Sequence, residues 1–385
     1  MLLHKSVEFD SRVRREASAL AAAGHQVIVL ELAPVAPDRA VLEGFTRRSV
    51  MPRPAWRHLL PFGSYRVVFL FAFLRGVIAS RPDVVHAHDA AMLVPGALGA
   101  RLTRARLVYD SHELATGVAY RHGLWAWFVS ALERMIVPRC AAVITVSDGI
   151  ATRMRERYGL AHSPVVIRNV SALEVDGAGA LRRALGLAAD ASLVLHQGAP
   201  APDRGCEVLL DAISRCGGVR LAFLGDPEAG YGELLSAEIE RRGLGTRVTL
   251  LPSVPLDELL ANTGEADVGV TLLQDTCENH RLALPNKLFE YIAARIPVIA
   301  SAMPEIERLV HGYEIGWCVK PDDADEVARA IRAAIAARGD AALRGHLERA
   351  ASELNWSRER LRLIELYEEL AGGRPRSPRQ ARPPA

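Results

Sequence analysis

Lysine is scarce in this sequence of 385 residues. Lys5, Lys287 and Lys320 are the only three, and the other 44 of the 47 basic residues are arginine. Such a composition uses arginine wherever a generic cation suffices. Each lysine is therefore a candidate for a specific role.

Cysteine is also rare and shows no metal or disulfide pattern. The five cysteines contain no C-x-x-C pair and no zinc spacing, and this odd, scattered set suits a reducing cytosol. The apolar run at residues 67–74 is far too short to span a bilayer, and no secretory signal is visible. The net charge of +2 argues against a dedicated nucleic-acid binder. We therefore expect a cytoplasmic protein that does not bind nucleic acid.

Two nucleotide-binding motifs are missing as well. Neither G-x-G-x-x-G nor G-x-x-x-x-G-K-[ST] occurs, which disfavours a dinucleotide fold and a P-loop. The single D-x-D, at Asp323 and Asp325, opens a late helix after Pro321. We interpret it as helix capping rather than as a metal–nucleotide site.

Short apolar runs alternate with amphipathic helical stretches along the chain, and the alternation restarts near residue 180. Strands are predicted at 2–3, 27–32, 84–88, 106–109, 142–146 and 165–167, and then at 192–196, 220–224, 247–250, 268–272, 298–300 and 316–319. Helices are predicted between them, at 10–23, 65–80, 91–102, 125–136, 148–158, 206–215, 232–242, 256–263, 286–294 and 324–337. This order predicts an α/β protein whose parallel sheets are covered on both faces.

We expect two doubly wound, Rossmann-like domains that face each other across a cleft. The first spans 1–170 and the second 171–355, with a linker at 171–180. A final helix at 356–371 and a disordered tail at 372–385 complete the chain. In each sheet, ligands bind at the carboxyl ends of the strands.

Lys287 lies in the first turn of a helix that Pro285 is predicted to open. A cation there faces the positive end of the helix dipole, a conflict that disappears if an anion binds at this helix start. Asn286 and Lys287 would offer backbone N–H groups, and Glu290, three residues on, would accept hydrogen bonds from sugar hydroxyls. The alternative is a solvated Lys–Glu pair.

A second anion site is predicted in the loop at residues 197–205. Gly198 permits close backbone approach, and Arg204 lies just before a helix start. Two basic residues at two helix starts in one domain indicate a diphosphate. The alternative is an ordinary strand–helix loop.

Polar residues close two neighbouring strands of the first half. His86 and His88 end one strand, and Asp110, His112 and Glu113 end the next, so all of them reach the cleft edge of the sheet. Histidine there suits proton handling or charge stabilisation. Two alternatives stay open, a metal site built from these residues and a structural imidazole.

Residues 46–81 interleave arginine with aromatic residues, and residues 125–128 add two tryptophans and a phenylalanine. This pattern would suit a peripheral contact with anionic lipid, at the inner face of the membrane. The alternative, which we favour, is a helix with an apolar core face and solvated arginines.

Several segments, in order along the chain, carry a resemblance to a known family. They are residues 10–17 with 24–27, then 83–89, 108–114, 143–147, the Arg204–Gly205 loop and 284–291. Together they resemble the retaining, nucleotide-sugar-dependent glycosyltransferases of the GT-B fold, family 4 type. The resemblance implies a donor nucleotide held mainly by the second domain, an acceptor held mainly by the first, a C-terminal helix that crosses back to the first domain, and no metal for donor binding.

The resemblance also assigns roles to residues. Glu290 matches the second Glu of the family's E-x7-E motif, which holds the ribose. Arg204 matches the basic residue that contacts the diphosphate, and His112 matches the active-site histidine near the transferred sugar. The first Glu of the motif would fall at Leu282. Glu278, one helical turn earlier, is a hypothetical substitute.

We therefore predict a glycosyltransferase that moves a sugar from a nucleoside diphosphate to a hydroxyl acceptor, a glycan, a lipid-linked glycan or a small molecule, with retention of configuration. No cofactor is expected besides the donor substrate. Two rivals stay open: a nucleotide-sugar epimerase of the same fold, and a non-catalytic nucleotide-sugar-binding subunit that supports a partner transferase.

Overall fold

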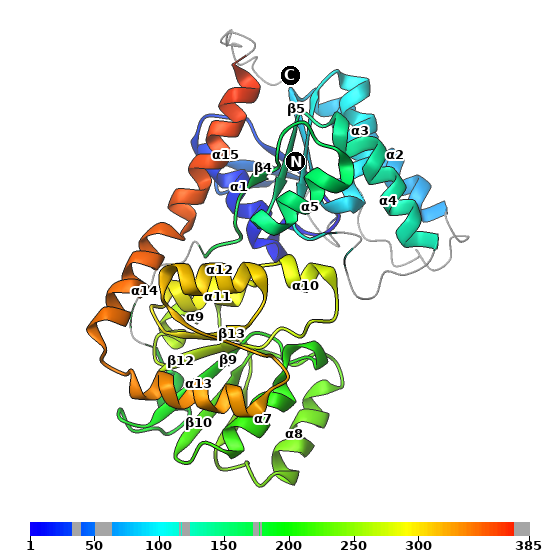
Figure 1. Cartoon of the computed structure of the whole chain (residues 1–385). Coiled ribbons are helices and arrows are strands. Elements are labelled where there is room, and N and C mark those ends of the chain that lie inside the picture. The colour runs from blue at the N-terminus through cyan, green and yellow to red at the C-terminus, as the bar shows by residue number, and fades with distance from the viewer. Residues whose placement is uncertain are drawn as a thin grey trace.

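Two sheets, each covered by helices, form two domains stacked along the molecule (Figure 1). The computed structural model describes residues 1–32, 40–50, 64–114, 117, 124–171, 177 and 179–372. The N-terminal sheet has the order β3-β4-β2-β1-β5-β6-β7-β8, and the C-terminal sheet β11-β10-β9-β12-β13-β14. Neighbouring strands are parallel throughout except for the β3–β4 pair at one edge.

The strands have the following bounds. The N-terminal sheet contains β1 (Leu2–Leu3), β2 (Ile28–Glu31), β3 (Ala40–Leu42), β4 (Phe45–Ser49), β5 (Val84–His88), β6 (Arg106–Ser111), β7 (Ala142–Thr145) and β8 (Val165–Val166). The C-terminal sheet contains β9 (Ser192–Gln197), β10 (Val219–Leu224), β11 (Val248–Leu251), β12 (Val268–Thr271), β13 (Val298–Ser301) and β14 (Gly316–Val319).

Helices connect these strands. The N-terminal domain has α1 (Ser11–Ala22), α2 (Ser64–Ser80), α3 (Asp89–Thr103), α4 (Leu124–Ile136) and α5 (Asp148–Tyr158). The C-terminal domain has α6 (Leu181–Ala184), α7 (Cys206–Ser214), α8 (Tyr231–Arg241), α9 (Leu256–Thr263), α10 (Glu278–Leu282), α11 (Asn286–Ala293), α12 (Pro304–Tyr313), α13 (Ala324–Ala336), α14 (Ala341–Glu353) and the start of α15 (Trp356–Ala371).

Burial of the strands on both faces explains their continuous apolar runs. In β9, Val194 belongs to the core cluster on one face of the C-terminal sheet, and Leu193 and Leu195 belong to the cluster on the other face. All three side chains are completely buried. Burial of a side chain of this size stabilises the fold by about 1.5–3 kcal/mol.

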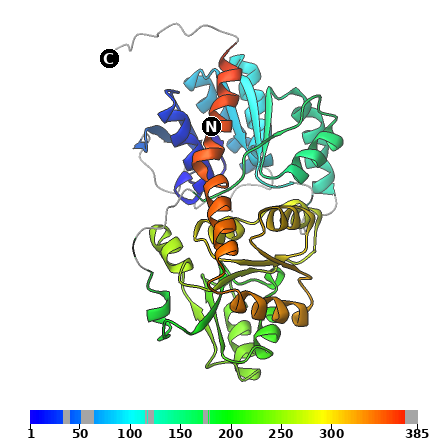
Figure 2. The same ribbon diagram turned by 60° about the vertical axis from the view of Figure 1, so that its left-hand side comes forward.

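Helix α15 returns to the N-terminal domain, as the family resemblance implied. Figure 2 shows it running in orange and red from the C-terminal domain up the side of the N-terminal one. Leu363, Leu366 and Tyr367 join the core cluster of the N-terminal domain, and Glu359 pairs with Arg168 at 3.1 Å. The helix therefore ties the two domains together.

Several elements differ from the sequence prediction. Strand β6 extends two residues beyond the predicted end, so Asp110 and Ser111 belong to the strand. The β3–β4 hairpin and helices α6, α10, α12 and α14 were not predicted. Helices α6 and α10 have only four and five residues, whereas α12 has a clear apolar face of Ile306, Leu309 and Val310 that the prediction missed. The tail from residue 373 on and most of the linker at 171–180 lie outside the described residues.

No helix in the described part of the chain combines the length and the apolar character that a membrane span needs.

Candidate active site

The site has a C-terminal half that begins where β9 ends. Gly198 follows the strand with φ +86°, a conformation that favours glycine. A Cβ atom on Gly198 would lie 2.6 Å from Cε of Lys287. A larger residue would therefore displace the Lys287 side chain, so glycine at this position leaves room for the ammonium group beside the loop at residues 197–205.

Helix α11 places Lys287 and Glu290 on one face. Pro285 is the N-cap residue rather than the first helical residue, which corrects its predicted position, and the helix starts at Asn286 as its predicted bounds have it. Asn286 and Lys287 occupy the first two helical positions, where backbone N–H groups have no intrahelical partner. Both predicted N–H donors therefore lie at the helix start.

Lys287 and Arg204 bring two positive charges together. Burial, and then the nearby Arg204 guanidinium, lower the pKa of Lys287 to about 8. Within the described residues Lys287 makes no ion pair, and Arg204 lies 3.4 Å from Asp203. Burial and then Lys287 lower the pKa of His196, beneath the loop, well below its ordinary value. A bound anion would relieve this concentration of positive charge.

Glu290 is held by a buried amide. Nε2 of Gln197 donates to Glu290, and the Thr263 hydroxyl donates to the Gln197 side-chain oxygen. Burial raises the pKa of Glu290 above its ordinary value, and the opposing effect of the Gln197 hydrogen bond does not outweigh it. The sequence prediction placed Gln197 in the loop at residues 197–205 but did not predict its contact with Glu290. Gln197 is instead the last residue of β9.

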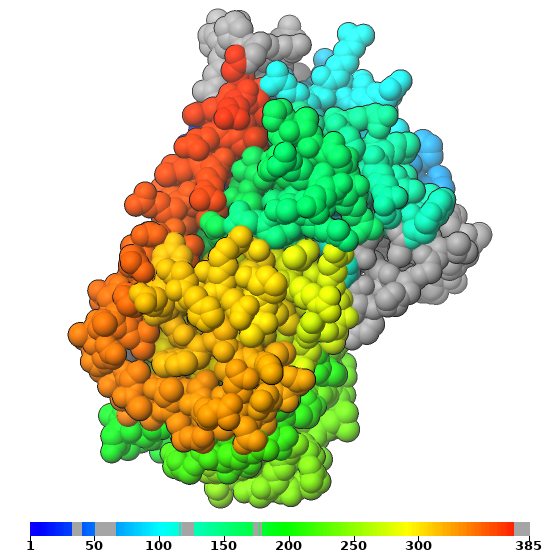
Figure 3. Space-filling view, in the orientation of Figure 1, coloured from blue at the N-terminus to red at the C-terminus, as the bar shows by residue number. Residues whose placement is uncertain are grey.

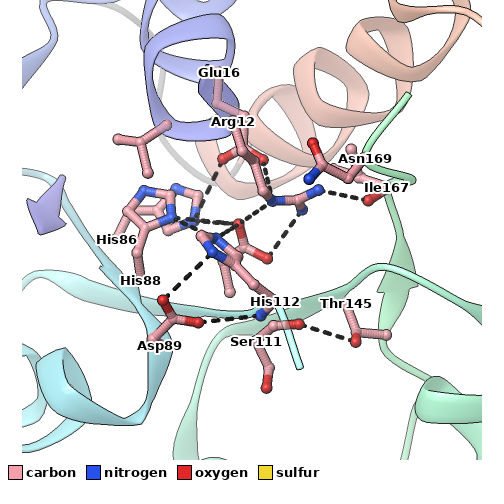
Figure 4. A network of polar contacts seen from close by, with 12 residues as sticks. Arg12, Glu16, His86, His88, Asp89, Ser111, His112, Thr145, Ile167 and Asn169 are labelled. Carbon is pink, nitrogen blue, oxygen red and sulfur yellow. Dashed lines mark hydrogen bonds and ion pairs between the residues drawn. The ribbon is translucent and has the colours of Figure 1, made fainter. Parts of the chain in front are cut away.

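The N-terminal half of the site is a buried polar network (Figure 4). Arg12, on α1, donates from Nε and Nη2 to the two carboxylate oxygens of Asp110, at 3.0 Å each, and from Nη1 to the Ile167 carbonyl at 2.8 Å. Arg12 Nε also lies 3.0 Å from Glu16. Arg12, Glu16 and Asp110 are all 3% exposed or less. The Arg12 guanidinium is therefore the cation at the centre of the network.

His112 lies between two carboxylates. Its Nε2 is 3.2 Å from Asp110, and its Nδ1 is 3.4 Å from Asp89. Burial lowers the pKa of His112, but Asp110 and then Asp89 outweigh this and raise it to about 9. His112 is therefore an imidazolium at neutral pH, able to donate hydrogen bonds but unable to accept a proton.

The candidate metal ligands that lie together in the structure differ from the predicted set. Glu16, His86, His88 and Asp110 have ligand atoms within 4.8 Å of one another, whereas the sequence had offered His112 and Glu113 beside the last three. Burial, with the Asp110 charge, raises the pKa of Glu16 to about 8 against the opposing effect of Arg12. Arg12 Nε already lies 3.0 Å from the carboxylates of Glu16 and Asp110. The guanidinium therefore supplies the positive charge that a metal ion would bring to this network.

His86 takes part in a structural contact. Its Nδ1 lies 2.8 Å from the hydroxyl of Tyr367 on α15. Burial lowers the pKa of His86 well below its ordinary value, so the ring is neutral. This geometry favours the structural-imidazole interpretation for His86.

Glu278 and Leu282 lie at the interface between the domains. Glu278 begins α10 and pairs with Arg153 of α5 at 2.6 Å, rather than with Lys287 or Arg204. Leu282 packs against the N-terminal core cluster that contains Leu114. The role of Glu278 as a substitute carboxylate stays a prediction.

Comparison with known proteins identifies the class. The family model for Glycosyltransferase Family 4 matches residues 11–170, and the model for Glycosyl transferases group 1 matches residues 191–337. The chain belongs to the nucleotide-sugar-dependent glycosyltransferases of the GT-B fold.

Individual relatives are distant. A glycogen synthase from Mycobacterium tuberculosis is 24% identical, over 92% of this chain and 89% of its own. Sucrose-phosphate synthase from Thermosynechococcus elongatus has a TM-score of 0.77 at 22% identity, covering 97% of this chain and 99% of its own. Anabaena HepE in complex with UDP-glucose has a TM-score of 0.73 at 18% identity, covering 96% and 98%. The structural likenesses establish the fold.

Proposed function

We propose that this glycosyltransferase moves a sugar from a nucleoside diphosphate to a hydroxyl acceptor with retention of configuration. The observation that carries the proposal is the pair of cations, Lys287 and Arg204, brought together beside Gly198 at the end of β9. The carboxylate of Glu290 lies one turn along the same helix. This arrangement fits a diphosphate with its ribose alongside.

The leaving group is the anionic diphosphate. When the bond between the sugar's anomeric carbon and the phosphate oxygen breaks, charge develops on that oxygen. Lys287, Arg204 and the N–H groups at the start of α11 would stabilise this charge. Gly198 lets the backbone approach the phosphates. Glu290, held by Gln197, would accept hydrogen bonds from the ribose hydroxyls.

The acceptor oxygen forms the new bond to the anomeric carbon on the face from which the diphosphate departs. Its proton passes to the departing diphosphate, which balances the reaction. Because both ring nitrogens of His112 lie beside carboxylates, those of Asp89 and Asp110, it would not act as the base, and it would donate to a sugar hydroxyl by exchanging one of these contacts. Neither a metal nor another cofactor has a role in this scheme.

A thermal-shift panel of UDP, GDP, ADP, CDP and dTDP, alone and as sugar conjugates, tests the proposal. UDP is the expected ligand, because HepE is described in complex with UDP-glucose. We expect a rise in melting temperature with one nucleotide, unchanged by EDTA. Loss of the shift with EDTA would contradict metal independence, and no shift with any nucleotide would contradict the donor site.

Turnover assays with the nucleotide sugar that binds, run with and without acceptors, separate the two rival functions. Conversion of the donor sugar without any acceptor would indicate the epimerase. Selective binding without transfer to any acceptor would indicate the non-catalytic subunit.

We also propose a peripheral membrane contact through α2, α3 and α4, which pack side by side on the N-terminal domain (Figure 3). Phe71 is 65% exposed on α2, and Trp127 is 70% exposed on α4. The exposed charged residues on the described part of this surface are Arg75, Arg101 and Arg134. Exposed aromatic rings among arginines suit an anionic lipid surface, such as the cytoplasmic face of a membrane.

Sedimentation with phospholipid vesicles tests this contact. We expect binding to anionic vesicles that weakens with salt, and weak binding to zwitterionic ones. The double substitution Phe71→Ser with Trp127→Ser should lower the bound fraction by about tenfold or more. Leu234→Ser, at a residue 67% exposed on α8 of the other domain, is the matched control. Equal binding by the double variant and the control would rule this surface out.

A further inference from the structure

Helix α10 lies between the two halves of the candidate site. It belongs to the C-terminal domain but lies at the boundary with the N-terminal one, next to α5 (Figure 1). Along this face the yellow atoms of the C-terminal domain meet the green atoms of the N-terminal domain (Figure 3). The family's first motif Glu would fall at the end of α10, where this chain has Leu282.

Asn279 holds the chain segment that follows His112. Its Oδ1 accepts from the backbone N–H of Leu114 at 2.9 Å, and its backbone N–H donates to the Gly117 carbonyl at 3.1 Å. A Cβ atom on Gly117 would lie 3.2 Å from the Asn279 nitrogen, so the close approach needs a small residue there. One residue of the C-terminal domain thus fixes two points of the His112 loop.

Two further contacts hold α10 in place against the N-terminal domain. The Ser147 hydroxyl, at the N-cap of α5, donates to the Leu282 carbonyl at 2.5 Å. The Leu282 side chain packs against the core cluster that includes Leu114. The apolar residue that replaces the motif carboxylate therefore works as a domain contact.

The other side of α10 contacts the loop at residues 197–205, the predicted anion site. Nδ1 of His280 lies 2.8 Å from the Gln274 carbonyl, and its Nε2 lies 3.6 Å from Asp203. Gln274 donates from its backbone N–H to the Asp203 carbonyl at 3.0 Å. Asp203 directly precedes Arg204 and lies 3.4 Å from it. Helix α10 thus contacts both the loop at residues 197–205 and the segment that follows His112.

We propose that α10 is a clasp between the domains and that Asn279 is a positioning residue for His112. This proposal rests on the proposed function. The clasp links diphosphate binding at the loop of residues 197–205 to the placement of His112 beside the sugar. When the domains separate, the Leu114 N–H and the Gly117 carbonyl exchange Asn279 for water. Asn279 therefore favours the closed arrangement, in which His112 is ordered between Asp89 and Asp110.

The test compares Asn279→Ala with Asn279→Asp in the full chain. The alanine loses the acceptor for Leu114, so turnover should fall by about tenfold. Nucleotide affinity, measured by calorimetry with the diphosphate alone, should fall by only a few fold, because the contacts to the diphosphate remain and only the coupling to the closed arrangement is lost. The aspartate keeps an acceptor oxygen and should restore most of the turnover. At saturating donor, where the bound diphosphate keeps Lys287 charged, the alkaline limb of the turnover–pH profile should also move to lower pH in N279A, because a loosened His112 loses its carboxylate partners.

Arg281→Ala is the control on the same helix, since Arg281 pairs with Asp275 inside its own domain. Equal turnover in N279A and R281A would overturn the proposal, and so would an unmoved alkaline limb. Small-angle X-ray scattering adds a measurement that needs no turnover: N279A should have a larger radius of gyration than the wild type and N279D. If the wild type binds no nucleotide, the proposed function fails, whereas the scattering comparison still decides whether α10 is a clasp.

Discussion

Replacing Asp110 by alanine is expected to lower the free energy of unfolding by about 3–5 kcal/mol, because it leaves the buried Arg12 guanidinium without its main partner. Asp110 is fully buried and receives two hydrogen bonds from Arg12, and His88 and His112 lie at 3.3 and 3.2 Å. Urea unfolding followed by tryptophan fluorescence measures the loss. Asp83→Ala, at an exposed aspartate just before β5, should change stability by less than about 0.5 kcal/mol.

The pH dependence of this loss has a definite sign. Burial raises the pKa of Asp110, but Arg12 and His112 outweigh this and hold it well below the ordinary value of 3.8. A lowered carboxylate pKa contributes stability that is present above pH 3.8 and is lost as pH falls through the folded-state value. The difference between wild type and D110A should therefore persist down to pH 3.8 and shrink below it. A D110A protein as stable as D83A at neutral pH would contradict the role assigned to Arg12.

Elements with local signals were predictable from the sequence. Ser147, directly before the predicted helix at 148–158, caps α5, and Asp323 caps α13, which confirms the capping interpretation of the D-x-D sequence. The final helix was predicted at 356–371 and is found there, with Asn355 as its cap. In each case a capping side chain and an apolar period lie within one short segment, so no distant contact is needed to define the element.

Long-range contacts were not predictable. Arg12 and Asp110 are 98 residues apart in the sequence, and no feature of either segment indicates that the two side chains form a pair. Glu16 had one local signal, because it lies on the same helix face as Val13, Ala17 and Leu20, where a charged residue needs a buried partner. Helix α10 has five residues, too few to show an apolar period, and its position depends on contacts with the other domain.

Replacing Lys287 by alanine is expected to weaken nucleotide diphosphate binding by about 100-fold, since a charge-assisted hydrogen bond contributes about 1.5–3 kcal/mol. Turnover should fall by about 100-fold to 1000-fold, as for removal of a donor that stabilises developing charge. Calorimetry with the diphosphate and turnover with its sugar conjugate measure the two effects. Lys320→Ala is the control, because Lys320 is an exposed lysine in the same domain.

The pH dependence of binding separates a direct role of Lys287 from a general structural one. In the free protein, burial and Arg204 lower its pKa to about 8, so Lys287 loses its proton as pH rises above that value. A diphosphate between Lys287 and Arg204 favours the ammonium form, and binding above pH 8 must then take up a proton. Affinity should therefore fall as pH rises above 8 in the wild type and in K320A, whereas K287A should show no such decline. An equal decline in K287A would mean that another group titrates and that Lys287 does not bind the diphosphate.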